Sequence, residues 1–138
     1  MFKFRLQTVL DLRVNELEIA ERTYLIAKSK REDAEQDLAG IHQMLQDQRR
    51  QPRETFQARL DAEAYNQRLE DESRAILTTI GVLEDEEAKA MEFWIDAKKE
   101  VKALEKLRDK AEEEYALEMN RKEQAELDEW AVLRRSAA

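Results

Sequence analysis

Few side chains in this sequence could do chemistry, because it has one histidine, His42, and no cysteine. A lone histidine on a helix, without a second histidine or a cysteine beside it, is more often a surface or packing residue than a metal ligand. Without cysteine there is no thiolate chemistry and no disulfide. The only glycines are Gly40 and Gly81, too few for a loop that cradles phosphate. We therefore expect neither a metal nor a cofactor.

Carboxylates are abundant and occur in runs, at residues 84–87 and 112–114. Neighbouring residues on a helix point in different directions, and two packed helices offer no concave pocket to shift their pKa values. With 42% hydrophobic and 41% charged residues, the composition is typical of long helices whose outer faces are solvated. We interpret the acidic runs as solvated faces and predict that the protein is not an enzyme.

Three further classes of function are disfavoured by the same composition. The net charge of -8 argues against nucleic acid as a partner, since binding phosphates needs a concentrated basic face. No stretch approaches the roughly 20 apolar residues that cross a bilayer, so we expect no direct membrane insertion. The first residues also lack the apolar run and the small-residue cleavage site of a signal peptide.

Apolar residues recur every seven positions on both sides of Pro52, the only proline. We call these positions the seam residues. Before Pro52 they are Leu6, Leu10, Arg13, Leu17, Ala20, Tyr24, Ala27, Arg31, Ala34, Leu38, Ile41 and Leu45. After it they are Leu69, Ser73, Ile76, Ile80, Leu83, Glu87, Ala90, Trp94, Ala97, Val101, Leu104, Arg108, Ala111 and Tyr115. A sustained apolar period of 3.5 residues is typical of a left-handed coiled coil.

The break at Pro52 makes the coiled coil a hairpin, because proline inside a helix loses a hydrogen bond and clashes with the preceding turn. The predicted fold is all-α: a long antiparallel two-helix coiled-coil hairpin that forms a single domain over residues 1–138. We expect the first helix at about 3–50, a polar turn at about 51–57 and the second helix at about 58–135. Thr55 is a candidate N-cap for the second helix.

Two registers of the hairpin are open, and each is named here by the sum of the residue numbers that face each other. Register 107 sets Leu10 against Ala97 and Leu17 against Ala90, which alternates large with small side chains. Register 114 lies one heptad away. Contact of Tyr24 with Leu83 would indicate register 107. In that register Arg13 either lies over the Trp94 ring or extends to water.

In both registers the second helix is longer, so its C-terminal part overhangs the first helix without a partner. Apolar residues continue there, at Tyr115, Leu117, Met119, Leu127, Trp130, Val132 and Leu133. Either they form a docking site, or the end is a frayed helix held by ion pairs such as Glu118 with Lys122. At the hairpin tip, Met44, Phe56, Leu60 and Tyr65 lie outside the seams; they either form a second contact zone or close the core locally.

The N-terminal stretch Phe2-Lys3-Phe4-Arg5-Leu6-Gln7 and the later stretches Leu104-Glu105-Lys106-Leu107 and Glu123-Gln124 followed by Asp128-Glu129 resemble the FliJ family of flagellar export proteins. The resemblance covers nearly the whole chain. It implies a small cytoplasmic protein of the flagellar type III export apparatus, peripherally associated with that apparatus at the inner membrane. It also implies a shape similar to the central stalk of rotary ATPases and no catalysis of its own.

The resemblance implies three partners: the hexameric export ATPase, the cytoplasmic domain of the membrane export gate, and export chaperones. Our hypothesis assigns the ATPase end to Phe2, Phe4, Tyr115, Met119, Leu127, Trp130 and Leu133, and gate binding at the tip to Ile41, Met44, Tyr65 and Leu69. Two alternatives remain open. One is a structural coiled coil that pairs with its own copy, and the other is the analogous stalk protein of injectisomes.

Overall fold

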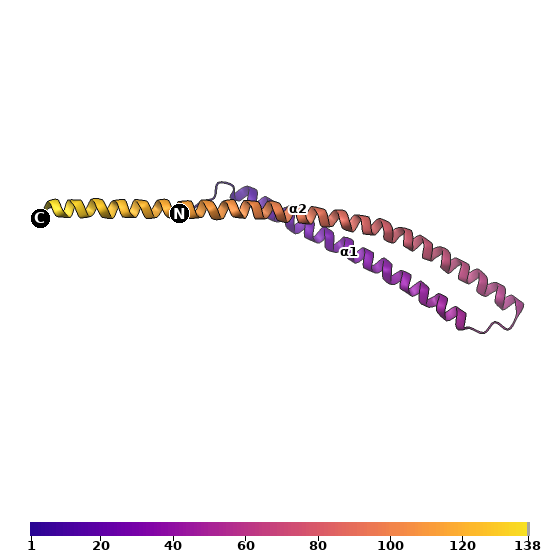
Figure 1. Cartoon of the computed structure of the whole chain (residues 1–138). Coiled ribbons are helices and arrows are strands. Elements are labelled where there is room, and N and C mark those ends of the chain that lie inside the picture. The colour runs from indigo at the N-terminus through magenta and orange to yellow at the C-terminus, as the bar shows by residue number, and fades with distance from the viewer. Residues whose placement is uncertain (138) are drawn as a thin grey trace. The chain divides into compact units, whose positions relative to one another are not determined.

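A computed structural model describes residues 1–137, and these residues form two long helices joined by one turn (Figure 1). Helix α1 spans Gln7–Arg50 and helix α2 spans Phe56–Ala137, 44 and 82 residues long. No strand occurs among residues 1–137. The predicted all-α fold of two long helices packed against each other is confirmed. Helix α1 begins later than residue 3, and the Gln7 amide donates to the Phe4 carbonyl at 3.1 Å just before it.

The turn around Pro52 is built from local hydrogen bonds that end one helix and begin the next. The Gln51 amide donates to the Gln48 carbonyl at 3.2 Å, which tightens the last turn of α1. Thr55 then accepts a hydrogen bond on Oγ1 from the Ala58 amide at 3.0 Å. This bond satisfies one of the amide groups left free at a helix start, so the predicted N-cap at Thr55 is confirmed.

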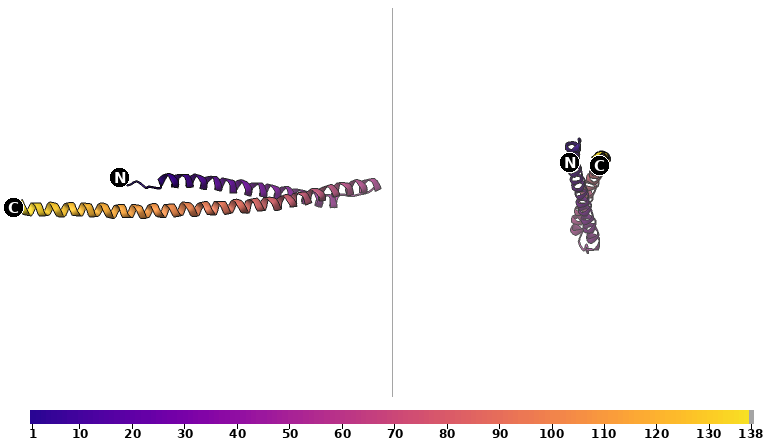
Figure 2. Two further views of the ribbon diagram at one scale, coloured as in Figure 1. Left: turned by 90° about the horizontal axis from the view of Figure 1, so that it is seen from above. Right: turned by 90° about the vertical axis from the view of Figure 1, so that its left-hand side faces the viewer.

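Close contacts group the chain into two compact units, each containing a stretch of both helices. We call Glu18–Ile95 the tip unit and Met1–Leu17 with Asp96–Ala138 the end unit. In Figures 1 and 2 the helices of the tip unit lie side by side up to the turn. All the seam residues are buried or half-buried in their units. The residues classed as buried are all seam residues: Leu10, Ala27, Ile41, Leu69, Ser73, Ile80, Ala90 and Val101.

In the tip unit, two contacts between the helices decide the register. Tyr24 stacks on Trp94, with ring centroids 5.2 Å apart and planes at 21°, and Arg31 pairs with Glu87. Register 107, which required Tyr24 to meet Leu83, is therefore wrong here. In register 114, Arg31 faces Leu83, whereas its observed partner Glu87 lies four residues, about one helical turn, further along α2. The observed partner of Tyr24 is offset by the same four residues. Side chains lean toward the N-terminus of their own helix, so contacts between antiparallel helices are shifted in this direction, as register 114 requires.

In the end unit, Arg13 is held by carboxylates. Its Nη1 lies 2.8 Å from Glu16 and 3.4 Å from Glu100. The hydrogen bond with Glu16, followed by the charge of Glu100, raises the pKa of Arg13. The side chain remains 39% exposed. Of the two expected positions for Arg13, this exposure fits the extension toward water better than burial against an aromatic ring. Glu100 neighbours Val101, the residue that register 114 places opposite Arg13.

Candidate partner-binding surfaces

The C-terminal part of α2 lacks a partner helix within the end unit. We call residues 116–137 the overhang; every one of them is exposed, whereas Tyr115 is half-buried. Its large apolar side chains are between 38% and 64% exposed, at Leu117, Met119, Leu127, Trp130, Val132 and Leu133. The predicted overhang with apolar residues and no partner in the hairpin is thus present.

The heptad pattern explains why burial stops at Tyr115. Continued along α2, the seam positions fall on Glu118, Lys122, Ala125 and Glu129, which would place charges between the helices. Such charges cost desolvation without gaining packing. Apart from Val132, the large apolar residues of the overhang lie off this line, so they cannot extend the hairpin seam and must be covered, if at all, by a different surface.

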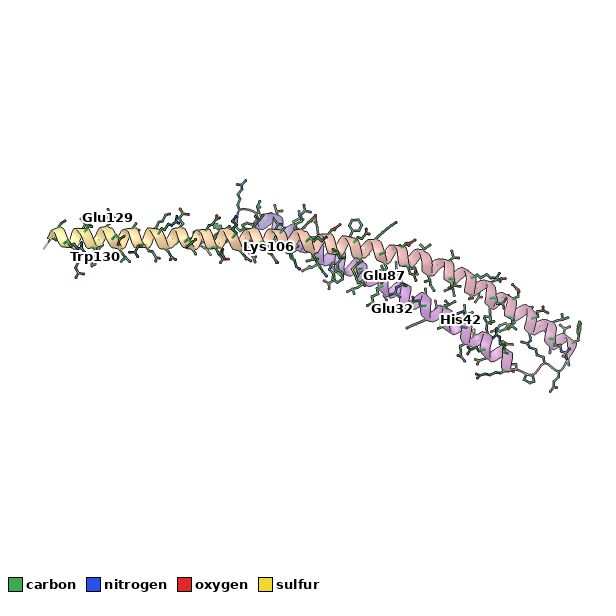
Figure 3. The ribbon with its side chains drawn as sticks, viewed as in Figure 1. Glu32, His42, Glu87, Lys106, Glu129 and Trp130 are labelled. Carbon is green, nitrogen blue, oxygen red and sulfur yellow. The ribbon has the colours of Figure 1, made fainter. Side chains whose placement is uncertain are left out.

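Trp130 lines an open groove on the overhang. The groove is lined by Glu123, Glu126, Leu127 and Trp130. The Arg134 guanidinium lies over the Trp130 ring, 4.8 Å from its centroid. In Figure 3 the side chains of Trp130 and Glu129 extend from different sides of the helix. An indole with carboxylates on one side and a guanidinium on the other fits a partner that offers an apolar pocket with charges at its rim.

Aromatic residues gather where the hairpin seam ends. The Phe2 and Tyr115 rings lie with their centroids 5.5 Å apart and tilted by 48°. The N-terminal ammonium of Met1 donates to the Tyr115 hydroxyl at 2.9 Å. Phe4 borders a neighbouring groove that Leu107 and Ala111 also line. The structure therefore brings Phe2 and Tyr115 together, as half-buried residues at the base of the overhang.

At the tip, the four candidate residues divide into core and surface. Ile41 and Leu69 are only 7% and 5% exposed, so they belong to the hairpin core instead of presenting a contact surface. Met44 is 48% exposed, and Tyr65 is half-buried with the Arg68 guanidinium 5.8 Å from its ring centroid. Heptad position separates the two classes, because Ile41 and Leu69 are seam residues and Met44 and Tyr65 are not.

Exposed apolar residues of the tip unit include two that the sequence placed in a candidate contact zone at the tip and others that it assigned to no site. Phe56 and Leu60 at the start of α2 are 74% and 44% exposed. Elsewhere in the tip unit, Ile19, Ile26 and Phe93 are 58%, 57% and 73% exposed. The spacing of Ile19 and Ile26, seven residues apart and off the seam, is the signal that could have identified these two exposed residues.

Residues 1–137 contain no group of three or more histidine, cysteine, aspartate or glutamate side chains placed to hold a metal ion. His42 is exposed on α1 (Figure 3). Neither helix, over the part that is described, is long and apolar enough to cross a membrane. What the described surface does offer is exposed apolar side chains, at the overhang and at the tip, and these are features of protein binding.

Comparison with protein families gave a match over nearly the whole chain. The family described as the flagellar FliJ protein matches residues 2–137. The chain belongs to the FliJ family. Comparisons with curated proteins and with solved structures gave no match. FliJ-family proteins are non-catalytic components of the flagellar export apparatus, and this membership makes the chain a component of that apparatus.

Proposed function

We propose that this FliJ-family protein is a non-enzymatic stalk of the export ATPase, with the overhang as the part that enters the ring. The observation that carries the proposal is the overhang itself, a single helix whose Leu127, Trp130 and Leu133 are 58% to 64% exposed. A helix without a partner can fit a narrow ring, and its apolar side chains gain from burial there. The aromatic pair of Phe2 and Tyr115 completes this end.

Truncation tests the assignment of the overhang. A chain ending at Ala116 keeps Tyr115 and every seam residue, so the hairpin is expected to remain helical. We expect it to lose binding to the purified ATPase and any stimulation of ATP hydrolysis. The matched control is the full-length chain carrying Glu129→Ala, which removes an exposed charge beside Trp130. Unchanged binding by the truncated chain would exclude the overhang as the ATPase-binding end.

We propose the tip surface for the cytoplasmic domain of the membrane export gate. Its exposed or half-buried members are Met44, Phe56, Leu60 and Tyr65, whereas Ile41 and Leu69 support it from the core. Replacing both Met44 and Tyr65 by aspartate is expected to weaken gate binding with helicity unchanged, because the new charges would have to be desolvated. The control is the pair Gln43→Asp and Gln67→Asp, which adds the same charge nearby. Equal affinity for all three chains would refute this assignment.

Export chaperones are the third class of partner that we propose, and family membership is what supports it. On the same basis the protein would act in the cytoplasm, attached to the export apparatus at the inner membrane through its partners. Pairing of two overhangs is the competing function, since the same exposed apolar residues could be covered by a second copy. The mass of the protein in solution distinguishes these possibilities and is considered in the Discussion.

A further inference from the structure

Two charged residues occupy seam positions in the tip unit, where apolar residues are the rule. Arg31 and Glu87 have side chains that are 20% and 17% exposed. The guanidinium binds the carboxylate with two donors, Nε to Oε2 and Nη2 to Oε1, the second at 3.2 Å. Arg31 also donates from Nη1 to Glu35 on its own helix at 3.0 Å. The hydrogen bond with Glu87, and then that with Glu35, raises the pKa of Arg31, so the guanidinium stays charged.

The seams alone permit several registers, each one heptad from the next. In register 107, Arg31 would face Ile76 and Glu87 would face Ala20. In the register one heptad beyond 114, Arg31 would face Ala90 and Glu87 would face Ala34. There the two side chains would lean away from each other, because each leans toward the N-terminus of its own helix. Only in register 114 do the charged ends of the Arg31 and Glu87 side chains reach the same height along the hairpin, where they can bind each other.

Large and small side chains alternate in register 107 and also in register 114, where Leu17 faces Ala97, so this alternation does not by itself choose between the two registers. We propose that the Arg31–Glu87 pair is the register lock of this hairpin. A charge left facing an apolar seam position loses its hydration without gaining a partner, and this penalty falls on both residues in every other register. A polar residue at a single seam position is a known means of fixing coiled-coil register. A change to register 107 would cost Tyr24 less free energy than it costs the charged pair, because Tyr24 could pack against Leu83 there.

The lock has a consequence for the tip surface. A slip of one heptad would move α2 along α1 by about 10 Å. Met44 on α1 and Tyr65 on α2 would then be displaced relative to each other by this amount. The pair thus holds the two halves of the tip surface in place. This consequence rests on the proposed gate binding, whereas the lock itself does not.

The natural absence of cysteine makes the register directly measurable by disulfide formation. Ser73→Cys serves as the common partner in three reporter chains, each carrying one more cysteine on α1. Ile41→Cys reports register 114, Ala34→Cys reports register 107, and Gln48→Cys reports the register one heptad beyond 114. Each chain is oxidised mildly at low concentration, and the intramolecular disulfide is quantified by mass spectrometry.

In the otherwise native chain, we expect cross-linking of the Ile41→Cys reporter to exceed that of the other two by at least about ten-fold. Combining Arg31→Leu with Glu87→Leu should keep the hairpin helical while making at least one of the other reporters cross-link to a similar extent. The reason is that apolar seam positions accept every register. The control, Lys28→Gln with Glu32→Gln, removes an exposed ion pair within α1 and should leave the native pattern unchanged.

The charge-exchanged chain, Arg31→Glu with Glu87→Arg, provides a second test because it rebuilds the pair in the opposite sense. It should restrict cross-linking to the Ile41→Cys reporter. The proposal is overturned if the double leucine chain still cross-links only through that reporter. It is also overturned if the double leucine chain loses its helicity, because the pair would then stabilise the hairpin instead of selecting its register, or if the charge-exchanged chain gives a mixture of registers.

Discussion

At the scale of single residues, Trp130 is the side chain that best fits the centre of a protein interface. It is large, 58% exposed and flanked by Leu127, two glutamates and Arg134. Tryptophan and arginine are enriched among the residues that dominate binding energies, while most surrounding contacts are energetically close to neutral. The contribution of Trp130 can therefore be separated from that of the helix that carries it.

We predict that Trp130→Ala lowers the affinity for the export ATPase by about ten-fold or more. Titration calorimetry with the purified ATPase measures this loss, and circular dichroism shows whether helicity is retained. Glu129→Ala, one residue away on a different side of the helix, is the matched control and should bind like the native chain. Equal losses for both substitutions would mean that Trp130 has no special role in the contact.

The seam residues make a contrasting prediction about stability. Ile80 is 8% exposed, and its neighbour Leu77 on the same helix is 52% exposed. Ile80→Ala should lower the free energy of unfolding by roughly 2 to 4 kcal/mol, because it removes buried methyl groups from a packed layer. Leu77→Ala should change it by less than about 0.5 kcal/mol. Urea unfolding followed by circular dichroism tests both values, and a larger loss for Leu77→Ala would contradict the assignment of the seam.

At the scale of elements, helix α2 is one continuous helix with two environments. Up to Tyr115 its seam residues pack against α1, and beyond it every described residue is exposed. Helices gain most of their stability from packing of an apolar face, so the overhang depends on weaker local interactions. One of these is the expected ion pair of Glu118 with Lys122, at 4.0 Å, and such exposed pairs contribute little.

We therefore predict that backbone amides of the overhang exchange with solvent far faster than those of residues 96–115. Hydrogen exchange followed by mass spectrometry measures the difference in the protein alone. Protection of the overhang should stay within about ten-fold of an unstructured peptide, because local opening there breaks no packing with α1. Adding the ATPase should slow this exchange if the overhang is the bound segment. Strong protection in the protein alone would show that something already covers the overhang.

The start of α2 provides a prediction about helix capping. Thr55→Ala removes the hydrogen bond to the Ala58 amide and should cost about 1 kcal/mol of stability. Thr55→Ser keeps the hydroxyl and should cost less than Thr55→Ala. Thermal unfolding of the two chains measures the comparison, and equal stabilities would show that the cap contributes nothing at this turn.

At the scale of the whole molecule, the oligomeric state distinguishes the proposed stalk from a self-pairing coiled coil. The chain carries a net charge of -8, which opposes association of identical copies at low salt. A stalk that enters a ring must leave its overhang uncovered, whereas a structural coiled coil would bury it in a dimer. Membership of the FliJ family favours the flagellar system over the injectisome alternative.

We predict a monomer at micromolar concentration in physiological salt, measured by sedimentation or by light scattering coupled to gel filtration. The control is the chain truncated after Ala116, whose mass should also be that of a monomer. A stable dimer of the full chain that becomes monomeric on truncation would identify the overhang as a self-pairing helix. That result would replace the stalk proposal.

Much of the fold follows from the sequence because a coiled coil records its packing in a local repeat. The seams, the break at Pro52, the cap at Thr55 and the end of burial at Tyr115 all depend on residues close together in the chain. The overhang could be predicted as well, because the second helix is the longer one in both of the registers that the seams leave open. None of these features requires knowing which of the two registers is occupied.

Only the tertiary structure decided the register and the surfaces that depend on it. A seven-residue repeat matches itself again after every slip of seven residues, so the sequence pattern cannot choose between registers. The lean of side chains along antiparallel helices then brings Tyr24 to Trp94 and Arg31 to Glu87, pairs that facing positions alone do not predict. The register also decides how Met44 on α1 and Tyr65 on α2 lie relative to each other, because a slip of one heptad moves one helix along the other by about 10 Å.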